Sequence, residues 1–202
     1  MPGRLILTRP AAEVAAFLGV AVPDLVPRLT IAPGEQVLCR AAGGAELARW
    51  GLIPVGRVNA RKRPVMETIH NARSETLFAK TAFAGVGRAI LPVDGWVDWT
   101  AGPGRRQAWR FRAVDGGCLA FAAIRDVWTA PGGPVLAQIA TVTCAPNEEV
   151  APHHDRMAVI LAPADFDLWL GGSEAEVTPL MRPWPAGRVV AERATEMDGA
   201  RG

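Results

Sequence analysis

The chain has 202 residues, half of them hydrophobic, and a formal net charge of only +2. This length supports one sizeable core and is short for two domains, and the composition excludes a disordered or strongly basic protein. No apolar run is long enough to span a bilayer, and the first residues lack the hydrophobic segment of a signal peptide, so we expect a cytoplasmic protein without a membrane partner. The three cysteines, Cys39, Cys118 and Cys144, lie far apart, which indicates buried thiols in a reducing compartment.

Pro2 follows the initiator methionine, and a residue this small permits the methionine to be removed. Removal exposes the secondary amine of Pro2, and a terminal amine has a pKa of roughly 7.7–8.0, so part of it is neutral and nucleophilic near pH 7. Residues 4–7 are typical of a short strand, which would carry Pro2 into the interior. Alternatively, Pro2 is simply a permitted second residue with no chemical role.

Apolar runs and turn residues predict a sheet with few helices. Strands are expected at residues 36–40, 46–50, 88–93, 96–99, 107–112, 118–124 and 135–143, separated by turns rich in Gly and Pro. Helices are expected after Pro10 and from Pro163 to Gly171, where apolar residues recur at helical spacing. The chain becomes polar after Pro185, so we assign residues 1–185 to one domain and 186–202 to a flexible tail.

Asp98 lies in the short strand between Trp96 and Trp99. We expect the two tryptophans to share one face of this strand and Asp98 to point to the other. A carboxylate in such surroundings is costly to bury unless it has a partner or a chemical task. Asn71 could orient a reacting group and Arg73 could hold a phosphate, whereas the alternative is that both residues tie down a turn.

Two other features allow more than one interpretation. Trp50 precedes Gly51 and could present its ring to a nucleic-acid base, although a tryptophan is more often part of a core or its rim. His153 and His154 are adjacent, and on an extended segment they would point in opposite directions, so they make a poor pair of metal ligands. We therefore expect neither a metal nor a cofactor.

Several short segments occur together in the order and approximate spacing of a known family. They are residues 31–34, 50–54, 71–76, 94–96 and 154–157. From Met1 to about Pro183 the chain resembles the SOS response-associated peptidase (SRAP) family, the abasic-site processing proteins. The resemblance implies one α+β domain on a strongly curved, barrel-like, mainly antiparallel sheet with a few flanking helices, and a channel across the sheet for single-stranded DNA.

The resemblance also implies a reaction, in which the N-terminal residue captures the ring-opened aldehyde of an abasic site. In the family this residue is a cysteine, whose amine and thiol close a thiazolidine. The implied catalytic residues are Pro2, Asn71 as the residue that positions the N-terminus, Asp98 in the place of a glutamate, and His154 as the proton carrier. The implied DNA contacts are Arg4, Pro33, Trp50, Arg73, Thr143 and Arg156.

The chain departs from the family pattern at several positions. Pro2 has no thiol, so it can form only an iminium, which is hydrolysed or proceeds by β-elimination to a cut strand, as in lyases that use an N-terminal proline. Asp98 is one methylene shorter than glutamate, which matters because proton transfer depends on hydrogen-bond reach. Ala158 replaces a proline, and the residues after Pro185 do not follow the usual pattern.

Two functions therefore stay open. The first is an abasic-site processing protein of the DNA damage response that binds single-stranded DNA and reacts through its N-terminal residue, as a cross-linking protein or a lyase. The alternative is a catalytically inactive paralogue that binds single-stranded or abasic DNA without covalent chemistry. The peptidase or hydrolase activity in the family name is a third interpretation, against which the missing thiol counts. We expect a monomer that associates with the nucleoid when it is bound to DNA.

Overall fold

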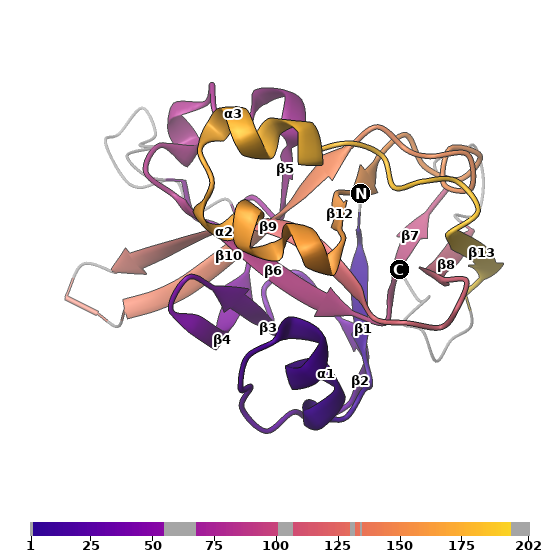
Figure 1. The fold of residues 1–202 in the computed structure, drawn as a ribbon, viewed down its shortest axis with the longest axis horizontal. Helices are drawn as coiled ribbons and strands as arrows, with labels where there is room; N and C mark the ends of the chain where they lie inside the picture. Colours follow the sequence, from indigo (N-terminus) through magenta and orange to yellow (C-terminus); the bar gives the residue numbers. More distant parts are fainter. Residues whose placement is uncertain (1, 55–67, 101–106, 130–131, 134, 195–202) are drawn as a thin grey trace.

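The computed structural model describes residues 2–54, 68–100, 107–129, 132–133 and 135–194. Its centre is a barrel in which five strands close into a ring (Figure 1). In ring order the strands are β10 (Val135–Cys144), β4 (Gly44–Trp50), β3 (Gln36–Ala41), β6 (Gly87–Val93) and β9 (Leu119–Thr129), and the pairing of β9 with β10 closes the ring. All of these pairs are antiparallel except β10 with β4.

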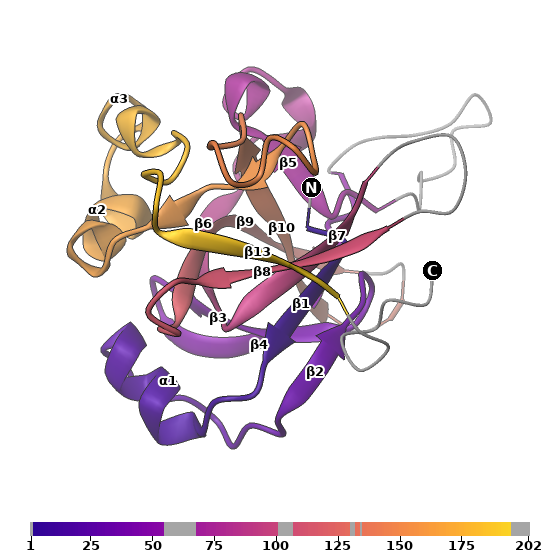
Figure 2. The ribbon, with the colours of Figure 1, turned by 90° about the vertical axis from the view of Figure 1, so that its right-hand side faces the viewer.

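A second sheet of five strands packs beside the barrel and faces the viewer in Figure 2. Its order is β13 (Val189–Arg193), β8 (Ala108–Ala113), β7 (Gly95–Trp99), β1 (Arg4–Leu7) and β2 (Arg28–Ile31), with antiparallel pairs throughout. The short strands β5 (Asn71–Arg73), β11 (Met157–Ala158) and β12 (Ile160–Leu161) extend the barrel sheet. The expected α+β fold on a curved, mainly antiparallel sheet is confirmed.

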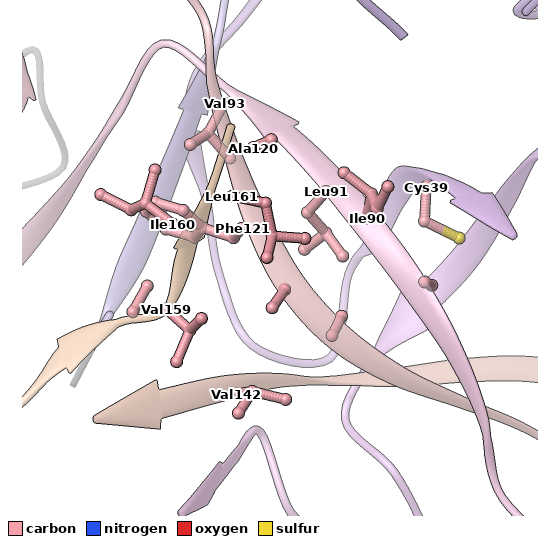
Figure 3. Close-up of a cluster of buried hydrophobic side chains, with 14 of the residues drawn as sticks. Cys39, Ile90, Leu91, Val93, Ala120, Phe121, Val142, Val159, Ile160 and Leu161 are labelled. Carbon is pink, nitrogen blue, oxygen red and sulfur yellow. The ribbon is translucent and has the colours of Figure 1, made fainter. Parts of the chain in front are cut away.

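The core of the barrel depends on the alternation of small and large residues along β9. Residues 119–124 of this strand are all buried, because the barrel and the elements around it cover both of its faces. Phe121 contacts Trp96 of the second sheet at 5.4 Å between ring centroids, while Ala120, Ala122 and Ala123 leave room for neighbouring strands to approach. The surrounding side chains in Figure 3 include Ile90, Leu91 and Val93 of β6, Cys39 of β3, Val142 of β10, and Val159, Ile160 and Leu161.

Helices are few and short. They are α1 (Ala11–Leu18), α2 (Phe166–Gly171) and α3 (Glu174–Val177), with the 3₁₀ turns η1 (Ser74–Thr76), η2 (Thr81–Phe83), η3 (Pro163–Asp165) and η4 (Thr178–Leu180). The first helix begins after Pro10 and ends at Gly19, whose φ of 68° is the left-handed conformation that glycine adopts readily. Trp169 of α2 donates its indole N–H to the carbonyl of Ala89 at 2.9 Å, which fixes this helix on β6. Among the described residues, no helix is long and apolar enough to cross a membrane.

The structure corrects the expected start of the tail at residue 186. Strand β13 pairs with β8 from Val189 to Arg193, and Val189 is buried. Glu192 accepts hydrogen bonds from Arg112 Nε and Nη2 at 3.3 and 2.5 Å across the two strands. The segment looked polar because an edge strand exposes many of its side chains. The rest of the predicted tail, residues 195–202, lies outside the part of the chain that the structure describes.

The structure also corrects the expected faces of β7. Trp96 and Trp99 are three residues apart, and side chains alternate along a strand, so they lie on opposite faces. Trp96 stacks on Phe111 at 4.8 Å between ring centroids and belongs to the main core. Trp99 packs instead with Ile6 and its neighbours on the other side of the sheet. Asp98 therefore shares its face with Trp96 alone.

Candidate functional site

The amino end of the chain is fixed in the second sheet between β7 and β2. Pro2 is buried, and Gly3 donates its backbone N–H to the carbonyl of Val97 at 3.0 Å. The Trp99 ring packs closely on Gly3, since a Cβ at residue 3 would lie 2.5 Å from Cζ3 of that ring. Strand β1 thus holds residue 2 at a defined place inside the protein, as the sequence predicted.

Asn71 contacts Pro2 through its side chain. It begins β5, which runs parallel to β10 with Asn71 opposite Thr141. Its Nδ2 donates to the carbonyl oxygen of Pro2 at 3.4 Å. Its Oδ1 is buried and has no hydrogen-bond partner among the described residues. A buried acceptor without a partner costs free energy, so this oxygen is suited to receive an N–H or O–H group that arrives beside residue 2.

Asp98 supplies a carboxyl group with an unusual affinity for protons. It is 5% exposed and lies directly opposite Trp109 of β8. Burial raises the pKa of Asp98 to about 7, although the positive charge of the amino terminus and the backbone N–H of Trp99 act in the opposite direction. Near neutral pH both protonation states are therefore populated, which suits a group that gives and takes a proton.

The tautomer of His154 follows from a backbone contact. The N–H of Arg156 donates to Nδ1 of His154 at 3.0 Å, so in the neutral ring the proton sits on Nε2. Asp155 Oδ1 also lies 2.9 Å from Nδ1, and it accepts a hydrogen bond from this nitrogen when Nδ1 carries a proton, as it does in the charged ring. Burial, and next the positive amino terminus, lower the pKa of His154. The amino terminus thus acts on both Asp98 and His154, and the neutral ring offers an Nε2–H donor.

Arg156 is already paired within the protein. Its Nη1 and Nη2 donate to the carboxylate of Glu75 at 2.5 and 2.9 Å, and Nη2 also donates to the Thr143 carbonyl at 2.5 Å. The side chain of Arg156 is only 13% exposed, whereas that of Glu75 is 52% exposed. A phosphate would therefore compete with Glu75 for this guanidinium, a feature that the sequence does not reveal.

Three of the other expected DNA contacts, Arg4, Pro33 and Arg73, are at least partly exposed. Arg73 is exposed at the end of β5, and Pro33 is partly exposed in the turn before β3. The Arg4 guanidinium lies 5.5 Å from the centre of the Trp99 ring, a cation–π arrangement. These side chains are accessible to a ligand at the surface.

Trp50 and Thr143 require a correction, because both are fully buried. Trp50 donates its indole N–H to the carbonyl of His70 at 2.9 Å, and Thr143 donates its hydroxyl to the carbonyl of Ala72 at 3.2 Å. A ring without exposed surface cannot stack on a base. These two side chains therefore hold β4, β5 and β10 together instead of lining a binding surface.

The comparisons with known proteins decide the family. A family model described as "SOS response associated peptidase (SRAP)" matches residues 1–197. The chain belongs to this family. It is 28% identical over 182 residues to the abasic site processing protein YoqW of Bacillus subtilis, covering 85% of this chain and 80% of that protein. It is also 28% identical over 155 residues to the abasic site processing protein YedK of Escherichia coli, covering 73% of this chain and 66% of that protein.

Solved structures show the same fold. A crystal structure of a Bacteroides thetaiotaomicron protein superposes with a TM-score of 0.83 at 20% identity, covering 96% of this chain and 92% of the other. A Bordetella bronchiseptica protein superposes with a TM-score of 0.81 at 22% identity, covering 96% and 99%. At these identities the likeness concerns the fold alone.

The cysteines of this SRAP chain are not suited to act as nucleophiles. Burial raises the pKa of the Cys39, Cys118 and Cys144 thiols to about 12. A thiol with so high a pKa carries almost no thiolate at neutral pH. No group of three or more His, Cys, Asp and Glu side chains within the described ranges is arranged to hold a metal ion.

The sequence did not indicate the place of two aromatic residues beside the candidate site. The ring of His153 lies 3.8 Å, centroid to centroid, from that of Trp109, the cross-strand neighbour of Asp98. Trp109 fell in a predicted strand, but only the pairing of that strand with β7 places it opposite Asp98. The alternation of Trp109 and Phe111 was a signal that this face is covered, and the partner strand was the missing information.

Proposed function

We propose that this SRAP protein processes abasic sites in single-stranded DNA, and that Pro2, freed of Met1, captures the sugar aldehyde as an iminium. The observation that carries the proposal is the place of Pro2, which is buried beside Asn71 and precedes Gly3, whose N–H bonds to the carbonyl of Val97, the residue before Asp98. The relatives named abasic site processing proteins support the class of substrate.

The chemistry uses groups that the site supplies. The neutral nitrogen of Pro2 attacks C1′ of the aldehyde, its proton is lost, and the carbonyl oxygen becomes the hydroxyl of a carbinolamine. Protonated Asp98 then gives a proton to this hydroxyl, which leaves as water while the C=N⁺ bond forms. The Nε2–H of His154 donates a hydrogen bond to the sugar oxygens, and the free Oδ1 of Asn71 orients the amine.

Two fates of the iminium are consistent with this chemistry. Water returns it to the aldehyde and free Pro2, or a base removes a proton from C2′ and the 3′ phosphate leaves by β-elimination. The carboxylate form of Asp98 is suited to be that base, because its pKa of about 7 leaves it partly ionised at neutral pH. A proline adduct is thus transient, unlike the thiazolidine of a cysteine.

We further propose that Arg4 and Arg73 contact the phosphates beside the lesion, with Pro33 at the edge of the same surface. Their accessibility and charge support this assignment. Because phosphate contacts release counterions, binding to single-stranded DNA should weaken with rising salt. We expect a monomer that acts inside the cell and lies on the nucleoid when bound.

The experiment is borohydride trapping on a single strand with one abasic site, using protein whose intact mass proves the loss of Met1. Reduction of the iminium should give a covalent adduct with verified free Pro2, and none when the amine is acetylated or Met1 is retained. Absence of an adduct with verified free Pro2 overturns the reaction. Salt-dependent binding without an adduct or a cut would then identify the inactive paralogue.

A further inference from the structure

A row of aromatic rings runs from the barrel to the loop that carries His154. Trp96 of β7 contacts Phe121 of β9 at 5.4 Å and stacks on Phe111 of β8 at 4.8 Å between centroids. Phe111 lies 5.8 Å from the ring of His153, which in turn lies 3.8 Å from Trp109 with an angle of 34° between the planes. The row therefore joins the two sheets to the loop before β11.

Asp98 lies beside this row. It is directly opposite Trp109 in the antiparallel pair of β7 and β8, so the two side chains share a face with their Cβ atoms about 4.5–5.5 Å apart. Trp96, two residues earlier on the same strand, lies on the same face. Asp98 is 5% exposed, whereas Trp109 and His153 are only partly buried. Trp109 is thus a partly exposed ring beside a buried carboxyl group, and the His153 ring lies against it.

The same stack holds the middle of the loop. The loop is tied at its start by Asn147, whose Oδ1 accepts from the N–H of Val150 at 3.2 Å, and at its end by the ion pair of Arg156. Between these points, the N–H groups of His153 and His154 share the Val150 carbonyl, each at 2.9 Å. Because the backbone N–H groups of the two histidines share this acceptor, the position of the loop backbone at His153 also sets that at His154.

We propose that Trp109 and His153 are positioning residues for the abasic-site reaction, and that their stack sets His154 against Asp98 and excludes water from the carboxyl group. The inference deepens the proposed function and rests on it. Neither residue touches the reacting atoms. Trp109 acts through Asp98, its cross-strand neighbour, and His153 acts through His154, its neighbour in the loop.

The charges around Asp98 determine what loss of the stack would do. The amino terminus attracts the carboxylate, the N–H of Trp99 donates to it, and Asp155 of the loop repels it. Burial is the larger influence and favours the protonated acid. Removal of a covering ring admits water, which stabilises the carboxylate, so the pKa of Asp98 should fall toward its ordinary value. The site would then lose its proton donor at a lower pH.

The test compares His153→Ala and Trp109→Ala with His153→Phe and Trp109→Phe, which keep a ring at each position. We expect the alanine variants to trap abasic DNA about tenfold more slowly at pH 7, with the alkaline limb of the pH profile moved down by about half a pH unit or more. The phenylalanine variants should restore the wild-type profile. Binding of undamaged single-stranded DNA should be unchanged in all four variants.

A second readout does not depend on the reaction. The ¹³C resonance of the Asp98 carboxyl, followed against pH without DNA, should titrate at lower pH in the alanine variants. Trp128→Ala is a matched control, because this partly buried tryptophan lies at the outer end of β9, on the hairpin that extends away from β8 in Figure 1. It should alter neither readout.

The inference is overturned if the alanine variants fold and show the same Asp98 titration and the same pH profile as wild type. If Trp109→Ala does not fold, His153→Ala still decides, because His153 lies in a loop and is partly exposed. If no protein, wild type included, yields an adduct, the proposed reaction is wrong. In that case the carboxyl titration still reports whether the stack covers Asp98.

Discussion

The replacement Asp98→Asn should make the protein more stable at neutral and alkaline pH. Burial raises the pKa of Asp98 from an ordinary value of 3.8 to about 7. A pKa difference of about 3 corresponds to roughly 4 kcal/mol between the two protonation states. Because the folded-state pKa is raised, the contribution of Asp98 to stability is fully present below its unfolded pKa and is lost as the pH rises through 7. Asparagine carries no charge and does not incur this loss.

The assay is chemical denaturation of both proteins from pH 4 to pH 9. Other titrating groups are common to the two proteins and largely cancel in the difference. The variant's advantage in free energy of unfolding should be small at pH 4, grow by at most about 1.4 kcal/mol per pH unit, and level off above pH 7 at no more than about 4 kcal/mol. Its rate of adduct formation should fall at least about a hundredfold, since it lacks the proton donor. A difference that does not vary with pH would refute the reasoning.

Three further predictions concern neighbouring residues. Pro2→Cys supplies a thiol beside the amine, so its adduct with abasic DNA should survive without borohydride. Denaturing electrophoresis would detect this adduct. An adduct that still depends on borohydride would contradict the assigned position of the amine. Glu75→Gln removes the charge that competes for Arg156. Binding isotherms should therefore show tighter DNA binding at low salt, and the plot of log affinity against log salt concentration should be steeper by up to about 0.7. Weaker binding would mean that Arg156 needs Glu75 for its position. Gly3→Ala places a Cβ 2.5 Å from the Trp99 ring. The free energy of unfolding should fall by about 1–3 kcal/mol, and trapping of abasic DNA should be slower. A variant as stable and reactive as wild type would show that the ring moves aside.

The parts of the fold that could be predicted from sequence are those with strong local patterns. Strand β1 was predicted with its observed bounds, and four of the barrel strands to within two residues at each end, because apolar runs there end at Gly or Pro, whereas β9 extends five residues past its expected end. Strand β2, between Pro27 and Pro33, was missed, and β13 was taken for part of a tail. Both are edge strands whose side chains are largely outside the core, so composition carries little information about them.

The candidate site shows the same limit. The sequence motifs indicated Asn71, Asp98 and His154, and the structure places the Asn71 amide on the Pro2 carbonyl. What could not be predicted depends on contacts between distant segments. The burial of Trp50, the pairing of Arg156 with Glu75, and the Trp109 ring opposite Asp98 all follow from strand pairing, which one-dimensional patterns do not specify.

Strand β10 has a consequence for the way the protein matures. It closes the barrel against β9 and β4, and it also aligns β5, with Thr141 opposite Asn71 and Thr143 opposite Arg73. The pairing of β10 with β4 and β5, segments far apart from it in the chain, thus brings Asn71 and Arg73 to their places in the folded protein. Under the proposed function, a copy in which β10 has not yet paired would carry the Pro2 amine without Asn71 beside it, which limits its reaction with small aldehydes before folding is complete.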